Sequence, residues 1–369
     1  MSHSVGRRIL LDAYWWNGGP PSGRNVVRSM TTAWSHRFPE DDLTLAVRAE
    51  DAADVRAQLS AADIRASVFS VPRWARIHSL AARSLGRRSL GFDAVVTQNF
   101  ATRTRGARSC VLVHDAMYVE HPGWFTPAER AYFSRLRPSL RDAETIFTTS
   151  AIETQRIARL WPETRSRLTR IGLAVPIDFA LSPGLRPAAV DEDERFVLVV
   201  GRLNVRKNLR RLIDAFCDSP GLARSHRLVV VGEADGRNED LALTGAEADR
   251  VSFLGRIGDP ELRWLYTHCD LFAFASLDEG YGLPLLEARS CGARIAASNL
   301  AVFRELGVVD VFFEPRSTAD IERALGVALS LPKPHPDPEL AHGWDGVVER
   351  MRAAVTPAVD DRNPHVSAA

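Results

Sequence analysis

The feature that most constrains the fold is the alternation of short apolar runs with helical patterns through both halves of the chain. This alternation is typical of βα units, in which helices cover a parallel sheet. We therefore expect the class α/β. The expected strands lie near residues 8–12, 43–48, 66–71, 94–98 and 110–114, and then near 196–200, 227–232, 250–254, 271–275, 294–297 and 311–313. The expected helices lie near 24–36, 51–60, 73–85, 127–138 and 151–160, and then near 208–217, 259–268, 284–291 and 318–330.

A stretch rich in proline and acidic residues divides the chain. Its sequence, PGLRPAAVDEDER at 183–195, combines proline, glycine and a charge run, which is typical of a linker. A chain of 369 residues is also long enough for two domains with a core each. We predict an N-terminal domain at 1–182, the linker at 183–195, a C-terminal domain at 196–335, a helical segment at 336–355 that packs back, and a disordered tail at 356–369.

The predicted strand 271–275 runs into the segment LDEGYGLPLLEARSCG at 277–292, which has the residues of a phosphate-binding turn. Pro284 suits the first helical position, so Leu283 is the expected N-cap. Leucine has no side-chain oxygen, and the free N–H groups of the first turn are therefore open to an anion. Taken alone, the segment fits an anion site and an ordinary strand-to-helix turn equally well.

Two glutamates bracket this turn. Glu279 precedes the glycines, and Glu287 lies one turn into the expected helix, where its carboxylate can accept hydrogen bonds from sugar hydroxyls. Gly280 and Gly282 allow the backbone to approach a ligand closely. The alternative for both carboxylates is exposure to solvent without a ligand.

Two cations follow the predicted strand 196–200, in the segment GRLNVRKNLRRLIDAF at 201–216. Arg202 and Lys207 can clamp a diphosphate and stabilise its charge without a metal ion. Of 47 basic residues only Lys207 and Lys333 are lysine, so Lys207 departs from the usage of the chain. A solvated basic loop is the alternative, and we expect Arg206, Arg210 and Arg211 to belong to one.

Composition excludes several classes of protein. The formal net charge of +1 does not fit a dedicated nucleic-acid binder. The four cysteines are far apart in the sequence, which argues against a zinc site or a disulfide framework. No apolar run approaches the about 18 residues of a membrane span. We therefore expect a cytoplasmic protein with reduced thiols.

Several motifs together resemble the retaining, nucleotide-sugar-dependent glycosyltransferases of family 4, and most of all their mannosyltransferase-like branch. They are the GR…RKN segment at 201–208, FLGRIGDPELRWLY at 253–266, EGYGLPLLEA at 279–288, CGARIAAS at 291–298, VLVHDAMYVEHPGWFTPAER at 111–130 and SAIETQRIARLWP at 150–162. The resemblance implies the GT-B fold, in which two Rossmann-like domains face a central cleft. It also implies that the N-terminal domain binds the acceptor and the C-terminal domain binds the nucleotide sugar.

The resemblance also implies roles for individual residues. Glu279 and His114 are the implied catalytic residues, both at the transferred sugar. The implied donor-binding residues are Arg202 and Lys207 at the diphosphate, Gly280, Tyr281, Gly282 and Leu283 through their backbone, Glu287 at the ribose, Arg256 and Ile257 at the base, and Gly23 in the N-terminal loop. That loop reads GGPPSGRN and departs from the family pattern, so only Gly23 is matched. No metal ion and no other cofactor are implied.

The predicted reaction is transfer of a hexosyl group, with retention, from a nucleoside-diphosphate sugar to a hydroxyl of a glycan, lipid-linked or small-molecule acceptor. GDP-mannose is the favoured donor, and cell-envelope polysaccharide or glycoconjugate synthesis is the expected setting. Glu279 is either a nucleophile or a stabiliser of charge. The alternatives are a sugar-nucleotide epimerase of the same fold and a non-catalytic nucleotide-sugar-binding protein.

One helix raises the question of membrane contact. The segment RWARIHSLAARSL at 73–85 is amphipathic, with Trp74, Ile77, Ala81 and Leu85 on one face and arginines near another. Basic amphipathic helices can lie on anionic membranes, which would allow peripheral contact with the inner membrane face. An ordinary surface helix with its apolar face in the core is the alternative.

Overall fold

The computed structural model describes residues 6–72, 77–234, 236–237 and 241–355, and these residues contain two parallel sheets. The first has the strand order β3-β2-β1-β4-β5-β6-β7, and the second has the order β10-β9-β8-β11-β12-β13. In each sheet the order reverses beside the first strand, as in doubly wound α/β folds. The class α/β is therefore confirmed.

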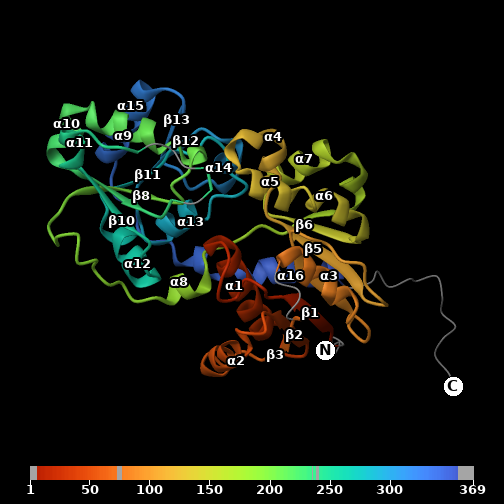
Figure 1. The fold of residues 1–369 in the computed structure, drawn as a ribbon. Helices are drawn as coiled ribbons and strands as arrows, with labels where there is room; N and C mark the ends of the chain where they lie inside the picture. The colour runs from red at the N-terminus through yellow and green to blue at the C-terminus, as the bar shows by residue number, and fades with distance from the viewer. Residues whose placement is uncertain (1–5, 73–76, 235, 238–240, 356–369) are drawn as a thin grey trace, which may run out of the picture.

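The N-terminal domain carries the first sheet (Figure 1). Its strands are β1 (Arg8–Asp12), β2 (Asp42–Val47), β3 (Ser67–Ser70), β4 (Ala94–Gln98), β5 (Arg108–Val113), β6 (Thr145–Thr148) and β7 (Leu168–Arg170). Its helices are α1 (Pro21–Arg37), α2 (Ala52–Ala61), α3 (His78–Gly86), α4 (Met117–Glu120), α5 (Pro127–Phe133), α6 (Leu136–Ser139) and α7 (Ala151–Leu160), with short 3-10 turns at Pro122–Trp124, Leu140–Asp142 and Pro162–Arg167.

The C-terminal domain carries the second sheet. Its strands are β8 (Phe196–Val200), β9 (Arg227–Val231), β10 (Val251–Gly255), β11 (Leu271–Phe274), β12 (Ile295–Ser298) and β13 (Val311–Phe313). Its helices are α9 (Leu209–Cys217), α10 (Pro220–Ser225), α11 (Gly245–Ala248), α12 (Asp259–His268), α13 (Leu283–Ser290), α14 (Ala301–Leu306) and α15 (Thr318–Ser330), with 3-10 turns at Val205–Lys207 and Pro338–His342. Helices α8 (Ile177–Leu181) and α16 (Trp344–Val355) lie where the chain passes between the domains.

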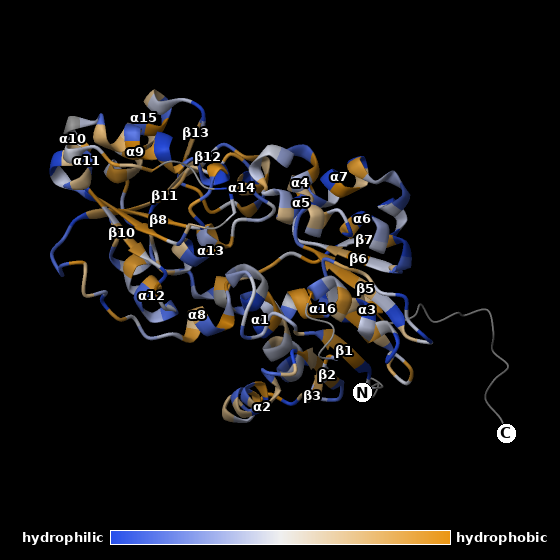
Figure 2. Ribbon diagram, in the orientation of Figure 1, coloured by the Kyte–Doolittle hydropathy of each residue, from blue (hydrophilic) through white to orange (hydrophobic). Residues whose placement is uncertain are grey.

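The central strands explain why the sequence shows continuous apolar runs. All five residues of β4 are buried, and so are all four of β11. Strands with helices on both faces have no solvent side, so they do not alternate between apolar and polar residues. Figure 2 shows the resulting apolar strands inside both domains.

The chain crosses between the domains twice. After β7 it runs through α8, where Phe179 is already buried in the core of the C-terminal domain. After α15 it returns, and α16 packs its apolar side chains, with Trp344 among them, into the N-terminal core. Trp344 Nε1 also donates a hydrogen bond of 2.9 Å to the backbone oxygen of Val175. Figure 1 shows α16, in blue, among the red and orange elements of the first domain.

Most predicted elements are present, with some differences. Strands β6 and β7 were not predicted, and the helix predicted at 127–138 is two short helices, α5 and α6. Of the predicted helix 73–85, residues 73–76 lie outside the described residues, and α3 runs from His78 to Gly86. Ala81 and Leu85 are buried, so the apolar face of this helix packs into the core. The predicted tail at 356–369 also lies outside the described residues.

Candidate functional site

The site predicted from the sequence lies where loops of the two domains meet. The turn after β11 brings Gly280 against the loop after β5, and a Cβ on Gly280 would lie 2.9 Å from His114 O and from Asp115 Cβ. The hydroxyls of Thr149 and Ser150 donate hydrogen bonds of 3.2 and 3.1 Å to Gly280 O. Only glycine allows so close an approach, so this turn is built for contact between the domains.

Glu279 lies beside Gly280 and is held by three side chains. Its Oε1 accepts hydrogen bonds from Lys207 Nζ at 2.6 Å and from Ser276 Oγ at 2.7 Å. Its Oε2 pairs with Arg206 Nη1 at 2.5 Å. The side chain is 10% exposed. Burial alone would raise the pKa of Glu279, but the charges of Arg206 and Lys207 outweigh it and hold the pKa at about 2. Glu279 is therefore a carboxylate at any physiological pH.

Arg206 was expected in a solvated loop, and this expectation is wrong. The 3-10 turn Val205–Lys207 ends at Asn208, which has a left-handed φ of 55°. This conformation is open to asparagine more than to most residues. Arg206 and Lys207, the last two residues of the turn, both reach the carboxylate of Glu279. Nothing in the local sequence distinguishes Arg206 from Arg210, which pairs with Asp214 and Glu247 instead.

Lys207 lies in a confined place. Its Nζ is 4.5 Å from the centroid of the Phe274 ring, and a Cβ on Gly201 would come within 3.0 Å of its Cε. Burial lowers the pKa of Lys207 to about 8, although the charge of Glu279 raises it. The positive charge of Arg202 also lowers the pKa of Lys207, so the two cations influence each other. Arg202 itself pairs across the domain boundary with Glu129, at 3.6 Å.

His114 is a neutral hydrogen-bonding group. Its Nε2 lies 2.9 Å from Gln98 Oε1, while Gln98 Nε2 donates to Asp12 O at 3.4 Å. That second bond fixes the orientation of the Gln98 amide, so His114 carries its proton on Nε2. Burial, with the charge of His78, lowers the pKa of His114 to about 4. Nδ1 is therefore an acceptor on the ring at neutral pH.

Helix α13 begins one residue earlier than expected. Its N-cap is Gly282, with a φ of 112°, and its first residue is Leu283, so the prediction of Leu283 as the cap is wrong. A Cβ on Gly282 would also lie 3.0 Å from the Phe303 ring. No side chain caps this helix, and its first turn has no acidic residue. The start of α13 thus retains the positive end of the helix dipole without a side-chain partner.

The rest of the turn and the second glutamate lie in apolar surroundings. The hydroxyl of Tyr281 donates a hydrogen bond of 2.5 Å to the backbone oxygen of Leu173, which lies in the segment after β7. Glu287 is 7% exposed, and its Oε2 accepts a hydrogen bond of 3.1 Å from the hydroxyl of the buried Tyr266. Burial raises the pKa of Glu287 to about 7. The two glutamates of the turn therefore have opposite environments.

The residues implied for base binding follow β10. Arg256 is exposed and Ile257 is partly buried against the C-terminal core. Burial lowers the pKa of Arg24, in α1 of the other domain, and the charge of Arg256 lowers it further. The charge of Asp259, at the start of α12, adds to the raised pKa of Glu287. The charges of the residues after β10 therefore act on Arg24 in α1 and on Glu287.

Gly23 lies inside α1 rather than in the loop before it. The helix begins at Pro21, and a Cβ on Gly23 would lie 2.4 Å from the Trp15 ring. The glycine thus makes room for an indole that is itself buried. Trp15 in turn packs near His114, with their ring centroids 5.9 Å apart.

A cluster of charges lies next to Glu279. Glu120, His121 and Asp278 each bring a potential ligand atom within 4.8 Å of one another. Arg156 pairs with Glu120 and with Asp278, at 2.7 and 2.6 Å. The positive charge among these carboxylates therefore comes from a guanidinium. The sequence did not bring these residues together, because Glu120 with His121, Arg156 and Asp278 belong to three separate segments.

Comparison with known proteins identifies the second half of the chain. Residues 185–338 match the family described as glycosyl transferases group 1. The matched residues span the second sheet, from β8 to α15, and contain Arg206, Lys207, Glu279 and Glu287. The resemblance predicted from the motifs is confirmed.

The relatives of this chain include proteins named as mannosyltransferases. The serotype-specific mannosyltransferase WbdA of Escherichia coli is 30% identical over 218 residues, which cover 55% of this chain and 27% of WbdA. The O-antigen chain mannosyltransferase B of Escherichia coli is 27% identical over 218 residues, which cover 56% of this chain and 57% of the relative. The chain thus spans between about a quarter and somewhat over half of the length of these relatives.

The fold of the whole chain is shared with solved glycosyltransferase structures. Sucrose-phosphate synthase from Thermosynechococcus elongatus aligns with a TM-score of 0.63 at 18% identity, over 95% of both chains. Together with the two parallel sheets, this likeness shows that the chain has the GT-B fold. Among the described residues, no helix combines the length and the apolar character that a membrane span requires.

Proposed function

We propose that this protein is a retaining glycosyltransferase. It transfers a hexosyl group from a nucleoside-diphosphate sugar to a hydroxyl of a glycan, lipid-linked or small-molecule acceptor. The observation that carries the proposal is Glu279, a buried, ionised carboxylate set between Arg206 and Lys207 and next to the loop of His114. A fixed negative charge beside two cations suits a reaction in which a sugar gains positive charge while a diphosphate leaves.

The cations of the site are proposed to bind the diphosphate and to stabilise its charge as it leaves. Glu279 uses one of the three N–H donors of Lys207, which leaves the others for phosphate oxygens. Arg202 and the uncapped start of α13 add positive charge on the same side of the domain boundary. Together these groups stabilise the departing diphosphate without a metal ion.

The proposed step breaks the bond between the anomeric carbon and the phosphate oxygen. The acceptor oxygen forms its bond to the same face of the sugar, and its proton passes to the departing phosphate oxygen. No side chain then acts as a base. Nδ1 of His114 accepts a hydrogen bond from a hydroxyl of the transferred sugar, and Glu287 accepts hydrogen bonds from the ribose hydroxyls. Both residues therefore orient the nucleotide sugar.

Glu279 fits stabilisation of charge better than nucleophilic attack. Both of its oxygens accept charge-assisted hydrogen bonds, and its pKa is held at about 2 by Arg206 and Lys207 against the effect of burial. A carboxylate that is so strongly stabilised is a weak nucleophile. The same carboxylate can still stabilise an oxocarbenium-like transition state through space.

GDP-mannose is the proposed donor, and cell-envelope polysaccharide or glycoconjugate synthesis is the proposed setting. The names of the two Escherichia coli mannosyltransferases support this choice. The proposed acceptor side is the N-terminal domain, whose segments after β5 and β6 reach the turn of Glu279. Contact with the inner membrane face is compatible with the exposed Arg83, in α3, and Arg87, directly after it.

A thermal-shift screen with GDP-, UDP- and dTDP-sugars tests the proposal. A donor at one hundred times its dissociation constant adds about 2.7 kcal/mol to the free energy of unfolding. We expect the largest shift with GDP-mannose, and the shift should be lost in Glu287→Ala. Incubation of the best donor without acceptor separates the alternatives, because an epimerase releases an altered nucleotide sugar. A protein that binds donor but never consumes it, with or without acceptors, would be a binding protein.

A further inference from the structure

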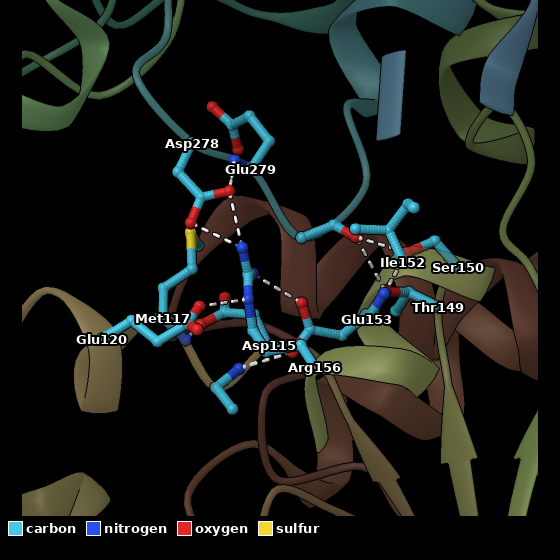
Figure 3. A network of polar contacts seen from close by, with 12 residues as sticks. Asp115, Met117, Glu120, Thr149, Ser150, Ile152, Glu153, Arg156, Asp278 and Glu279 are labelled. Atoms are coloured by element: carbon cyan, nitrogen blue, oxygen red, sulfur yellow. Dashed lines mark hydrogen bonds and ion pairs between the residues drawn. The ribbon is translucent and has the colours of Figure 1, made fainter. Parts of the chain in front are cut away.

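Arg156, in α7 of the N-terminal domain, forms ion pairs with carboxylates of both domains (Figure 3). Its Nε pairs with Glu120 and its Nη1 with Glu153, both at 2.7 Å and both within its own domain. Its Nη2 donates to both oxygens of Asp278, at 2.8 and 2.6 Å. Asp278 belongs to the C-terminal domain and immediately precedes Glu279. Only 9% of the Arg156 side chain is exposed.

On one side, Arg156 is connected to the turn that carries Glu279. Asp278 Oδ1 accepts a hydrogen bond of 2.8 Å from the backbone N–H of Glu279. The backbone oxygen of Asp278 accepts a bond of 3.3 Å from Arg206, whose own oxygen accepts from Leu277 N at 2.9 Å. The position of Asp278 thus fixes the backbone from which Glu279 extends.

On the other side, Arg156 is connected to the loop that carries His114. Glu153 uses Oε2 for Arg156, and its Oε1 accepts a hydrogen bond of 2.8 Å from Ala116 N, two residues after His114. Glu153 has no exposed surface, so its charge depends on the guanidinium beside it. One side chain therefore holds both loops of the proposed site, one through Glu153 and one through Asp278.

We propose that Arg156 is a positioning residue that makes the placement of Glu279 depend on contact between the two domains. When the domains are in contact, the guanidinium neutralises Asp278 and holds its oxygen toward the Glu279 N–H. Without Arg156, the carboxylates of Glu120 and Asp278, which have oxygens within 4.8 Å of each other, repel across the boundary. The buried Glu153 loses its charged partner as well. The turn is then displaced although every residue that touches the donor is still present. This inference rests on the proposed function for its kinetic part.

Arg156→Gln is the direct test, and Arg159→Gln is its matched control. Arg159 lies on the same helix and pairs with the same Glu120, but 66% of its side chain is exposed. Hydrogen exchange of the whole chain gives a readout that does not depend on turnover. We expect faster exchange in Arg156→Gln at the segments 114–118 and 277–281, and wild-type exchange at these segments in Arg159→Gln. Unchanged exchange at 277–281 in Arg156→Gln, or an equal increase across both domains, would overturn the positioning role.

Kinetics supply the second readout. We expect Arg156→Gln to lower kcat at least tenfold while the dissociation constant for GDP stays within twofold, because Lys207 and Glu287 keep their places. Added to Glu279→Gln, it should cause no further loss, whereas an additive loss contradicts action through Glu279. If Arg156→Gln does not fold, Asp278→Asn removes the charge that Arg156 holds at 2.6 Å and that His121 approaches at 3.4 Å, and it should reproduce both results. A wild-type chain that turns over no nucleotide sugar would refute the proposed function, and hydrogen exchange would still decide this inference.

Discussion

Replacing Glu279 with glutamine tests the electrostatics of the site most sharply. The amide has nearly the same size as the carboxylate but has no charge. Arg206 and Lys207, which lie 2.5 and 2.6 Å from the two oxygens, then face each other without an anion between them. The change should therefore reduce both stability and turnover.

The expected loss of stability follows from the pKa of the carboxyl group. Burial raises the pKa of Glu279, but Arg206 and Lys207 hold it at about 2 instead of the ordinary 4.5. At about 1.4 kcal/mol per pKa unit, the ion pairs contribute about 3 kcal/mol to the free energy of unfolding. Because the pKa is lowered, this contribution is complete above pH 4.5 and is lost as the pH falls through about 2.

Glu287→Gln is the matched control, because it should act in the opposite direction. Burial raises the pKa of Glu287 from 4.5 to about 7. A raised pKa means that the ionised form is disfavoured in the folded protein, so stability falls as the pH rises from 4.5 to 7. The glutamine removes this loss, which amounts to about 3 kcal/mol at pH 8 and is small at pH 5.

Urea denaturation at pH 5 and pH 8 measures both changes. We expect Glu279→Gln to be less stable than wild type by about 3 kcal/mol at both pH values. We expect Glu287→Gln to be more stable at pH 8 and nearly equal at pH 5. Turnover of Glu279→Gln should fall about 10²- to 10³-fold. If both variants change stability in the same direction at pH 8, the assignment of opposite environments is wrong.

Three further outcomes follow from the site. Lys207→Ala and Arg202→Ala should each lower kcat/KM at least tenfold with an intact fold by circular dichroism, and near wild-type rates in both would remove the proposed diphosphate clamp. Chelators should leave turnover unchanged, because the cations of the site are side chains; complete loss that magnesium restores would contradict this. Because burial lowers the pKa of His114 to about 4, His114→Asn should reduce the rate by the same factor at pH 6 and pH 8. A factor that differs tenfold between the two pH values would show that the imidazole titrates in this range.

The sequence predicted the fold where local pattern and burial agree. Strands such as β4 and β11 are continuous apolar runs because helices cover both of their faces. Strand β6, with the sequence TIFT, offers only two apolar residues, yet all four residues are buried at the inner part of the sheet. Strand β7 has only three residues. Such short or polar strands exist because neighbouring strands pair with them, which no local pattern reveals.

The candidate site was predictable in its parts but not in its contacts. Glu279 and Lys207 stand out in the sequence by motif, but their hydrogen bond joins residues 72 positions apart. The contact of Arg156 with Asp278 joins residues 122 positions apart and depends on how the domains meet. Arg206 could not be separated from its neighbours, because its contacts with Glu279 and Asp278 join segments that are far apart in the sequence.

The central claim is that the site of Glu279 transfers a hexosyl group with retention. Water can replace the acceptor, so slow donor hydrolysis tests the claim before an acceptor is known. We would follow GDP-α-mannose hydrolysis by real-time proton NMR, with Glu279→Gln as the control. The account predicts α-mannose as the first product from the wild-type protein and almost none from the variant. β-Mannose as the first product, or an equal rate from the variant, would contradict it.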